Sequence, residues 1–250
     1  TFGFDWKKNV PLPKELPEQD WPINYDRNMQ LLRCLLAIDE SLGKVLDTLE
    51  EIGELDNTVI IYSSDNGYFM GEHTFLDKRL AYENSMRVPM LIRYPKHIKN
   101  GTVIDELCLN IDVAPTILDF ANLKIPKYMQ GESMKNLLNG KHQRNWRKTF
   151  LFEYFVDTYW PYAGPNQIAV RTDRYKLIDN FLKDDIDELY DLVKDPGEMV
   201  NLINSPEYQN VENELRDTAE DLKEKYNYNP NRDWWLRQVI KANKSRILNN

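Results

Sequence analysis

The sequence is poor in the residues that mark several large classes of protein. It has two cysteines in 250 residues, Cys34 and Cys108, and no C-x-x-C pair. This argues against a zinc or dithiol redox site and predicts two buried free thiols. Acidic residues outnumber basic ones by 40 to 32, which gives a net charge of -8. A nucleic-acid-binding protein would need a basic face, so the charge balance argues against nucleic acid as a partner.

Long hydrophobic runs are absent as well. The most apolar stretch, LLRCLLAI (31–38), is interrupted by Arg33 and is far shorter than the roughly 20 residues that span a bilayer. The N-terminal stretch TFGFDWKKNVPLPKELP lacks an initiator Met and a signal-peptide core. We therefore expect no membrane segment, and we expect residues 1–24 to form an extended arm within a longer chain.

What the chain does contain is an alternation of helical and strand-like patterns. Apolar residues recur at helical spacing from Asp26 to Gly53, and NTVIIYSS (57–64) is β-branched throughout, as in a strand covered on both faces. VPMLIRYP (88–95) and DELCLN (105–110) predict two further strands, and residues 112–123 predict a helix. This order predicts an α/β layer architecture.

The pattern changes after about residue 145. TFLFEYF, QIAVRTDRYKLI and DELYDLVKD alternate like antiparallel strands, and residues 206–226 form an amphipathic helical pattern. We therefore expect a domain boundary near 145, with an α/β portion at 1–145 and a smaller α+β subdomain at 146–250.

Polar residues follow the strand pattern 57–64 directly. Asp65 and Asn66 supply a carboxylate and an amide oxygen, hard donors that suit Ca²⁺ or Mg²⁺ better than zinc. Ligands of open α/β sheets bind at the carboxyl ends of strands, so we expect the pair at the end of a central parallel strand, facing a cleft. The alternative is an ordinary S-D-N-G turn, because Asp, Asn and Gly are common turn residues.

Two further polar residues follow within the same segment. Lys78 carries a compact positive charge suited to an anionic oxygen, and His73 can donate hydrogen bonds or transfer protons near neutral pH. Each also has a plain alternative, a solvated surface lysine and a loop histidine bonded to backbone. Close to a strand-end carboxylate, they form a candidate anion-binding segment, and we expect Lys78 to point into the same cleft.

Taken together, these motifs resemble the sulfatase family of the alkaline-phosphatase superfamily. The match includes S-D-N-G, G-E-H, D-K-R, Y-E-x-S-x-R-V-P and I-R-Y-P within residues 58–95. It continues through IDVAPTILDFANLKIP, MQGESMKNLLNG, VRTDRYKLI and ELYDLVKDPGEMVNL. The resemblance implies part of an alkaline-phosphatase-like mixed sheet flanked by helices, followed by a small antiparallel-sheet-plus-helix subdomain.

The resemblance also implies roles for the polar residues. Asp65 and Asn66 match the family's strand-end calcium ligands, and Lys78 matches the lysine that contacts the sulfate group. His73 belongs to the G-E-H element and is a candidate for the rim of the active site. The implied reaction is hydrolysis of a sulfuric ester, and such enzymes usually work in the periplasm, in the lysosome or outside the cell.

A second candidate region is the aromatic loop EYFVDTYWPY. It falls where related enzymes shape the substrate pocket, so Tyr159 and Trp160 are candidates to stack on a sugar ring. The alternative for both is packing between the two domains. The resemblance and this loop together favour a sulfated carbohydrate or an aryl sulfate as substrate.

The chain departs from the family where the nucleophile should be. Sulfatases use a formylglycine made within C/S-x-P-x-R, and neither cysteine nor any serine fits that motif. The paired aspartates that complete the family's calcium site are absent too. We therefore expect a C-terminal half that needs the missing N-terminal half of the same protein and has no sulfatase activity alone.

Two alternatives stay open. One is a phosphate or phosphonate ester hydrolase of the same superfamily, although the residue after the acid is Asn66, which favours calcium over zinc or manganese. The other is a catalytically inactive module that binds a glycan or a partner protein.

Overall fold

The computed structural model describes residues 25–141, 143–154, 166–180 and 186–228. In the first part of the chain the elements are α1 (Tyr25–Glu51), η2 (Leu55–Asn57), β1 (Ile60–Ser63), β2 (Phe69–Met70), η3 (Glu72–Thr74), β3 (Leu76–Asp77), α2 (Glu83–Met86), β4 (Met90–Arg93), η4 (Asn110–Asp112), α3 (Val113–Phe120) and α4 (Lys135–Leu138). The predicted N-terminal arm, residues 1–24, lies outside the described residues. None of the described helices is long and apolar enough to cross a membrane.

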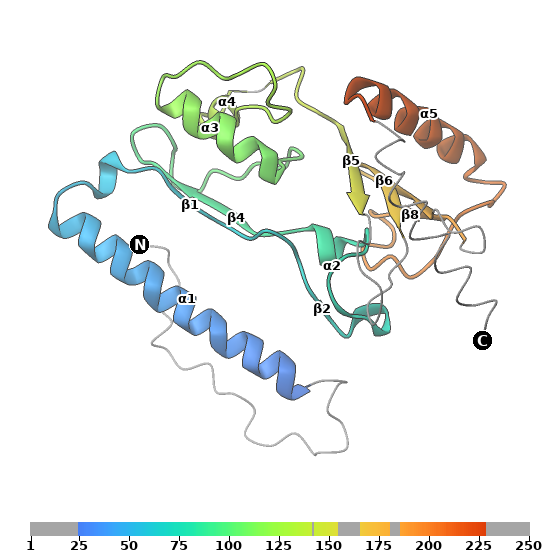
Figure 1. Ribbon diagram of the computed structural model, residues 1–250, viewed down its shortest axis with the longest axis horizontal. Helices are drawn as coiled ribbons and strands as arrows, with labels where there is room; N and C mark the ends of the chain where they lie inside the picture. Colours follow the sequence, from blue (N-terminus) through green and yellow to red (C-terminus); the bar gives the residue numbers. More distant parts are fainter. Residues whose placement is uncertain (1–24, 142, 155–165, 181–185, 229–250) are drawn as a thin grey trace, which may run out of the picture.

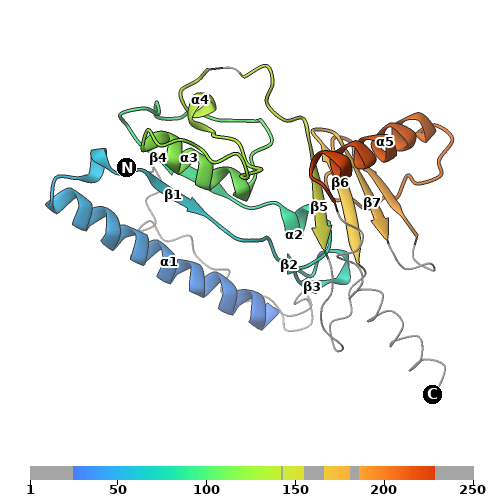
Figure 2. The same ribbon diagram turned by 45° about the horizontal axis from the view of Figure 1, so that its top comes forward.

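The long first helix is confirmed close to its predicted bounds, but its apolar residues are not buried. Leu36 is 69% exposed and Ile52 is 63% exposed. In both ribbon views α1 lies on one side of the β1–β4 pair, while α3 and α4 lie on the other side (Figures 1 and 2). The predicted burial of Cys34 on this helix is wrong, because the side chain is exposed, and Cys108 is half-buried.

The predicted strand at 57–64 is present as β1, but its pairing differs from the expectation. It pairs with β4 in antiparallel register, from Ile60 opposite Arg93 to Ser63 opposite Met90. Among the described residues β4 is its one partner, and all four β1 residues are half-buried rather than covered on both faces. A continuous apolar run is typical of a parallel strand covered on both faces, but the pattern follows from burial alone, and the neighbour that β1 has among the described residues is antiparallel.

The predicted strand at 105–110 is wrong. These residues form no strand, and Asn110 begins η4 instead. The backbone N–H of Leu109 donates to the Asp112 carboxylate at 2.7 Å. That donor is therefore taken by a side chain and is not free to pair with a neighbouring strand.

The second part of the chain is an antiparallel meander covered by one helix. Its elements are β5 (Thr149–Tyr154), β6 (Gln167–Thr172), β7 (Tyr175–Asn180), β8 (Glu188–Asp191) and α5 (Gln209–Lys225), and the strands lie in sequence order. The helix α5 packs on one face of this sheet (Figures 1 and 2). The predicted antiparallel strands and amphipathic helix are confirmed, because the apolar face of α5 is buried against Val170, Leu177 and Leu189.

Candidate functional site

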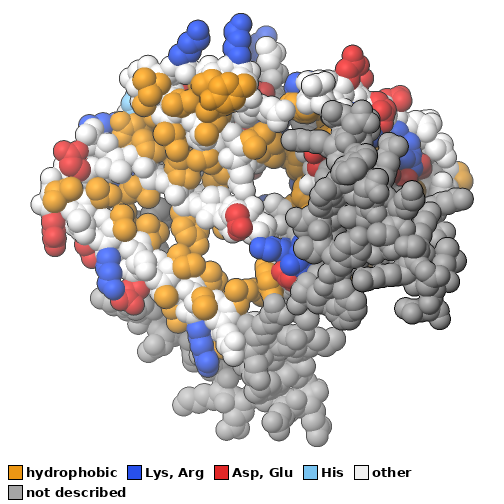
Figure 3. Space-filling model, viewed as in Figure 1, with side chains coloured by type: hydrophobic (Ala, Val, Ile, Leu, Met, Phe, Trp, Pro, Cys, Tyr) orange, Lys and Arg blue, Asp and Glu red, His pale blue; other side chains and the backbone are white. Residues whose placement is uncertain are grey.

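A wide cleft runs along β4 and the segment 98–111 and reaches the end of β1. Asp65 and Asn66 line this cleft of about 1390 Å³, together with Arg87 and Asn110. The volume is above the roughly 300–1,000 Å³ of ordinary small-ligand pockets. Figure 3 shows hydrophobic side chains at the surface of this part of the molecule, with hollows near the middle of the view. The predicted acid–amide pair therefore does face a cleft, although its strand is antiparallel.

The turn that carries the pair is held by its neighbours. The Asn110 side-chain amide donates to the backbone oxygens of Ser64 and Asp65, each at 3.1 Å. Gly67 packs so closely on α2 that an added Cβ would lie 2.1 Å from the carbonyl oxygen of Asn84. Glycine is therefore required at 67 by the approach of two backbones.

The donor set at this turn suits part of a calcium site. Asp65 uses Oδ1 to accept the N–H of Asn66 at 2.9 Å, and the Asn66 amide nitrogen donates to the Gly67 carbonyl at 2.7 Å. Among the described residues Asp65 Oδ2 and Asn66 Oδ1 accept no hydrogen bond, so both hard oxygens are available. A full set is not present, because no group of three or more His, Cys, Asp or Glu side chains in the described residues could hold a metal ion.

His73 lies in an aromatic cluster rather than in the cleft. Its ring centroid is 4.4 Å from that of Tyr82 and 6.4 Å from that of Phe75. The fully buried Phe69 ring contacts the same group edge-on. His73 is half-buried and is not among the residues that line the cleft. The role of His73 at the rim of the active site stays a prediction.

The backbone around Lys78 is strained. Four non-glycine residues of this segment have positive φ: His73 (52°), Thr74 (63°), Asp77 (80°) and Arg79 (105°). Such conformations cost of order 1–3 kcal/mol each and cluster at functional sites. Lys78 itself is exposed and does not line the cleft. The expectation that its ammonium points into the cleft is therefore not met by the described residues, and its role in binding sulfate stays a prediction.

The sequence motifs did not single out the residues that anchor this segment to the second part of the chain. Ala81 donates its backbone N–H to Gln167 Oε1 at 2.9 Å, and Tyr82 donates its hydroxyl to Glu188 at 2.7 Å. The backbone N–H of Glu83 donates to Glu198 at 2.7 Å. Three consecutive residues are thus bonded to the C-terminal sheet and the loop after it. The Y-E-x-S motif was the signal that could have directed attention to Glu83.

A carboxylate shared by two tyrosines forms one of these anchors. Glu188 accepts hydrogen bonds from Tyr82 at 2.7 Å and from Tyr190 at 2.6 Å. Burial and the adjacent Glu188 carboxylate raise the pKa of both phenols above the usual value. Both tyrosines therefore stay protonated as hydrogen-bond donors at neutral pH. The other two predicted substrate residues, Tyr159 and Trp160, lie outside the described residues.

Two family models match the chain. "N-sulphoglucosamine sulphohydrolase, C-terminal" matches residues 71–225, and "Sulfatase" matches residues 16–123. Among curated proteins, the chain is 41% identical over 202 residues to the N-acetylglucosamine-6-O-sulfatase of Bacteroides thetaiotaomicron, covering 79% of this chain. It is 35% identical over 233 residues to the arylsulfatase of Clostridium perfringens, covering 83% of this chain.

Solved structures agree. The structure of BT4656 in complex with its substrate D-glucosamine-2-N,6-O-disulfate matches with a TM-score of 0.75 at 41% identity, over 78% of this chain and 40% of that one. The phosphonate monoester hydrolase of Agrobacterium radiobacter matches with a TM-score of 0.66 at 26% identity, over 76% of this chain and 39% of that one.

The matches cover most of this chain but less than half of each of these relatives. The chain spans 36% of the Bacteroides enzyme and 47% of the Clostridium enzyme. The larger of the two model matches still takes in well over half of the chain. With its strand-end acid–amide pair and its fold, the chain therefore belongs to the sulfatase family of the alkaline-phosphatase superfamily.

Proposed function

We propose that this chain is the C-terminal portion of a sulfuric ester hydrolase that acts on a sulfated carbohydrate. The observation that carries the proposal is the placement of Asp65 and Asn66 on the cleft in a chain of this family. The relatives support the substrate class, because one is named an N-acetylglucosamine-6-O-sulfatase and BT4656 was solved with a sulfated glucosamine. The division near residue 145 into a catalytic portion and a C-terminal subdomain belongs to the same proposal.

In this proposal Asp65 and Asn66 supply two of the ligands of a Ca²⁺ ion. Calcium takes about 6–8 oxygens, so further ligands must come from the part of the family's length that this chain does not span. When bound, the ion would stabilise negative charge on the sulfate oxygens. Lys78 would add a positive charge beside the sulfate, and His73, Tyr159 and Trp160 would shape the sugar site.

The nucleophile is not supplied by this chain. No C/S-x-P-x-R occurs in its 250 residues, so the family's formylglycine would lie on the preceding part of a longer protein. The exposed apolar residues of α1, among them Leu36 and Ile52, would then be covered by that part. We place the protein in the periplasm, in the lysosome or outside the cell, as is general for the family.

A chromogenic aryl sulfate provides the test. The full-length protein should hydrolyse it, and chelation of calcium should lower the rate. The isolated 250-residue chain should have no activity with or without calcium. In the full-length protein Lys78→Ala should lower kcat by about tenfold or more through loss of a charge at the sulfate, whereas the exposed Lys124→Ala should not. Turnover by the isolated chain, or a Lys78→Ala rate within about twofold of the parent, would contradict these assignments.

A second candidate is hydrolysis of phosphonate or phosphate esters. The structural similarity to the Agrobacterium phosphonate monoester hydrolase supports it. The amide at Asn66 favours calcium over zinc or manganese. It therefore favours sulfate esters over phosphate and phosphonate esters as substrates. Comparing kcat/KM for an aryl sulfate and for the matching aryl phosphonate separates the two activities directly. Binding of a sulfated glycan by a full-length protein that hydrolyses neither ester would instead favour an inactive binding module.

A further inference from the structure

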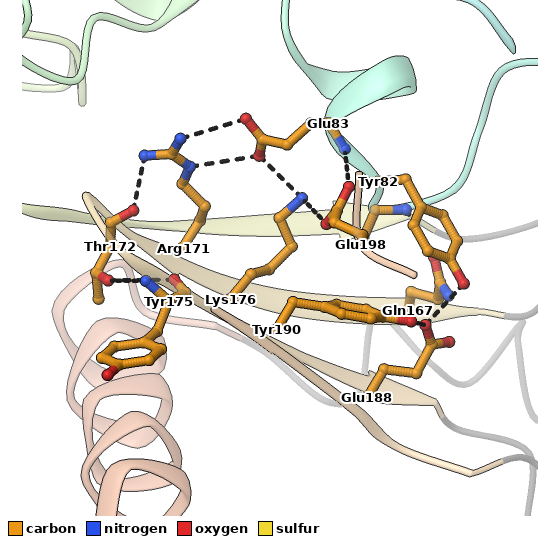
Figure 4. Close-up of polar contacts among 11 residues, drawn as sticks. Tyr82, Glu83, Gln167, Arg171, Thr172, Tyr175, Lys176, Glu188, Tyr190 and Glu198 are labelled. Atoms are coloured by element: carbon orange, nitrogen blue, oxygen red, sulfur yellow. Dashed lines mark hydrogen bonds and ion pairs between the residues drawn. The ribbon is translucent and has the colours of Figure 1, made fainter. Parts of the chain in front are cut away.

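A buried cluster of charges lies between the candidate site and the C-terminal sheet. Lys176 on β7 is fully buried, and its ammonium lies 2.6 Å from Glu198 Oε1 and 2.9 Å from Glu83 Oε1. Arg171 on β6 approaches the same Glu83 carboxylate at 3.2 Å. Figure 4 shows the lysine between the two glutamates, with the arginine on the far side of Glu83.

The cluster is balanced in charge. Two cations face two carboxylates, which offsets the desolvation that an isolated buried charge would suffer. Burial alone would raise the pKa of Glu83, but the Lys176 ammonium and the Arg171 guanidinium hold it below its usual value. For the fully buried Glu198, burial dominates and raises the pKa. Breaking a buried pair of this kind leaves an uncompensated charge and is strongly unfavourable.

The backbone of Glu198 adopts a strained conformation. Its φ of 54° lies in the left-handed region that non-glycine residues rarely adopt. A conformation of this kind persists when the surrounding contacts over-determine it. Here those contacts are the Lys176 ammonium on Oε1 and the backbone N–H of Glu83 on Oε2. The single carboxylate therefore joins a strand of the sheet to the first residue of α2.

From α2 the contacts lead to both halves of the candidate site. The carbonyl of Ser85 accepts the N–H of Gly67 at 2.8 Å, next to Asn66. The hydroxyl oxygen of Ser85 accepts the N–H of Arg79 at 2.9 Å, next to Lys78. Ser85 is itself buried. One short helix thus holds the acid–amide turn with its backbone and the lysine segment with a side chain.

We propose that Glu83, Lys176 and Glu198 are positioning residues, which hold α2 so that Ser85 fixes the acid–amide turn and the Lys78 segment relative to each other. Glu83 lines the cleft, whereas Lys176 and Glu198 do not, so these two side chains act on turnover through Glu83 and α2. The effect on turnover rests on the proposed sulfatase function, whereas the effect on the backbone at 67 and 79 does not. A misplacement of about 1 Å in such a site costs about a hundredfold in rate.

The test compares two ion pairs of the same sheet in the full-length protein. Lys176→Met breaks the cluster. Arg174→Met breaks the neighbouring pair between Arg174 and Asp191, whose Oδ2 lies 2.8 Å from the guanidinium. Among the described residues neither side chain hydrogen-bonds or ion-pairs with α2. Each variant is measured for kcat and KM on an aryl sulfate, for thermal stability, and for amide exchange of peptides covering Gly67 and Arg79.

With Lys176→Met we expect exchange at Gly67 and Arg79 to accelerate by about tenfold or more and kcat to fall by a similar factor, with KM within about threefold. Arg174→Met should change neither, even if it lowers the melting temperature equally. Equal effects of the two variants, or a folded Lys176→Met with unchanged exchange, would overturn the proposal, because the cluster would then be only structural.

If Lys176→Met does not fold, the isosteric Glu198→Gln decides by the same measurements, and unchanged exchange at Gly67 and Arg79 counts against the proposal. If the parent and Arg174→Met both fail to hydrolyse any sulfate ester, the proposed function is wrong. Amide exchange alone then decides whether the cluster positions the turn.

Discussion

The helices α1 and α5 are both amphipathic, yet they sit in opposite environments. On α5 the apolar residues Leu215 and Leu222 are 4% and 7% exposed. On α1 Leu36 and Ile52 are 69% and 63% exposed. The first pair completes a core with the β5–β8 sheet, and the second pair is exposed, while Leu42, Leu46 and Leu49 of the same helix are half-buried. Helical periodicity therefore predicts which face needs a cover, and the tertiary structure decides whether a cover is present.

The difference extends to two parts of the chain. The β5–β8 sheet and α5 form a closed core, whereas residues 25–141, the open region, leave apolar side chains of α1 exposed. The C-terminal sheet packs against α5 around a hydrophobic core, whereas β1 and β4 form a two-stranded pair beside a wide cleft. Two strands alone are marginally stable in water. The open region is also the one that carries Asp65, Asn66 and Lys78. In the proposed function, it is completed by the preceding part of a longer sulfatase.

The largest effect is expected from a substitution in the hydrophobic core between the β5–β8 sheet and α5. Leu189 is 0% exposed, so Leu189→Ala should lower the free energy of unfolding by about 4 kcal/mol, through lost burial and a residual cavity. The matched change on the exposed face, Leu36→Ala, should alter it by less than about 0.5 kcal/mol in this chain. Urea unfolding followed by circular dichroism measures both. A large cost for Leu36→Ala would mean that α1 is covered within this chain.

A slightly smaller effect is expected for the buried ion pair between Asp112 of the open region and Arg147. Asp112 is 0% exposed and accepts from the N–H of Glu132 at 2.8 Å and from both terminal nitrogens of Arg147. Asp112→Asn removes the buried carboxylate from Arg147, which keeps only a longer 4.0 Å pair with Glu132, and should cost about 3 kcal/mol.

The control for this change is Asp119→Asn, at a carboxylate that pairs with Lys135 and whose side chain is 35% exposed. It should cost under about 1 kcal/mol. Similar urea midpoints for the two variants would show that the Asp112–Arg147 ion pair does not stabilise the open region.

The smallest perturbation is chemical labelling of the two thiols. Burial, with a contribution from the nearby Asp112 carboxylate, raises the pKa of Cys108 to about 11. Little of that thiol is ionised at pH 8, and the thiolate is the reactive form. Iodoacetamide should therefore alkylate the exposed Cys34 of α1 about tenfold or more faster than Cys108, as read by mass spectrometry.

Two controls sharpen the labelling experiment. In urea the two rates should converge, because both thiols are then exposed. In the full-length protein Cys34 should become protected if the preceding part covers α1. Rapid labelling of Cys34 in the full-length protein would contradict that part of the proposal.

The local sequence determined much of this protein. Helical spacing gave α1 and α5 close to their observed bounds, alternation gave the antiparallel strands after residue 145, and S-D-N-G gave a polar pair at a strand end that does line a cleft. These features depend on periodicity and on short-range backbone chemistry, which neighbouring residues set among themselves. The family motifs likewise lie in short continuous stretches, which is why a single sequence was enough to identify them.

Only the tertiary structure decided which residues meet across long distances in the chain. The carboxylate of Glu83 meets an arginine 88 residues away, and its backbone N–H meets a carboxylate 115 residues away. The direction of the partner of β1, the loss of the strand at 105–110 and the position of Lys78 outside the cleft were also decided there. A side chain's pattern in the sequence reports how buried it should be, but the identity of its partner depends on how distant elements pack, and no local pattern carries that information.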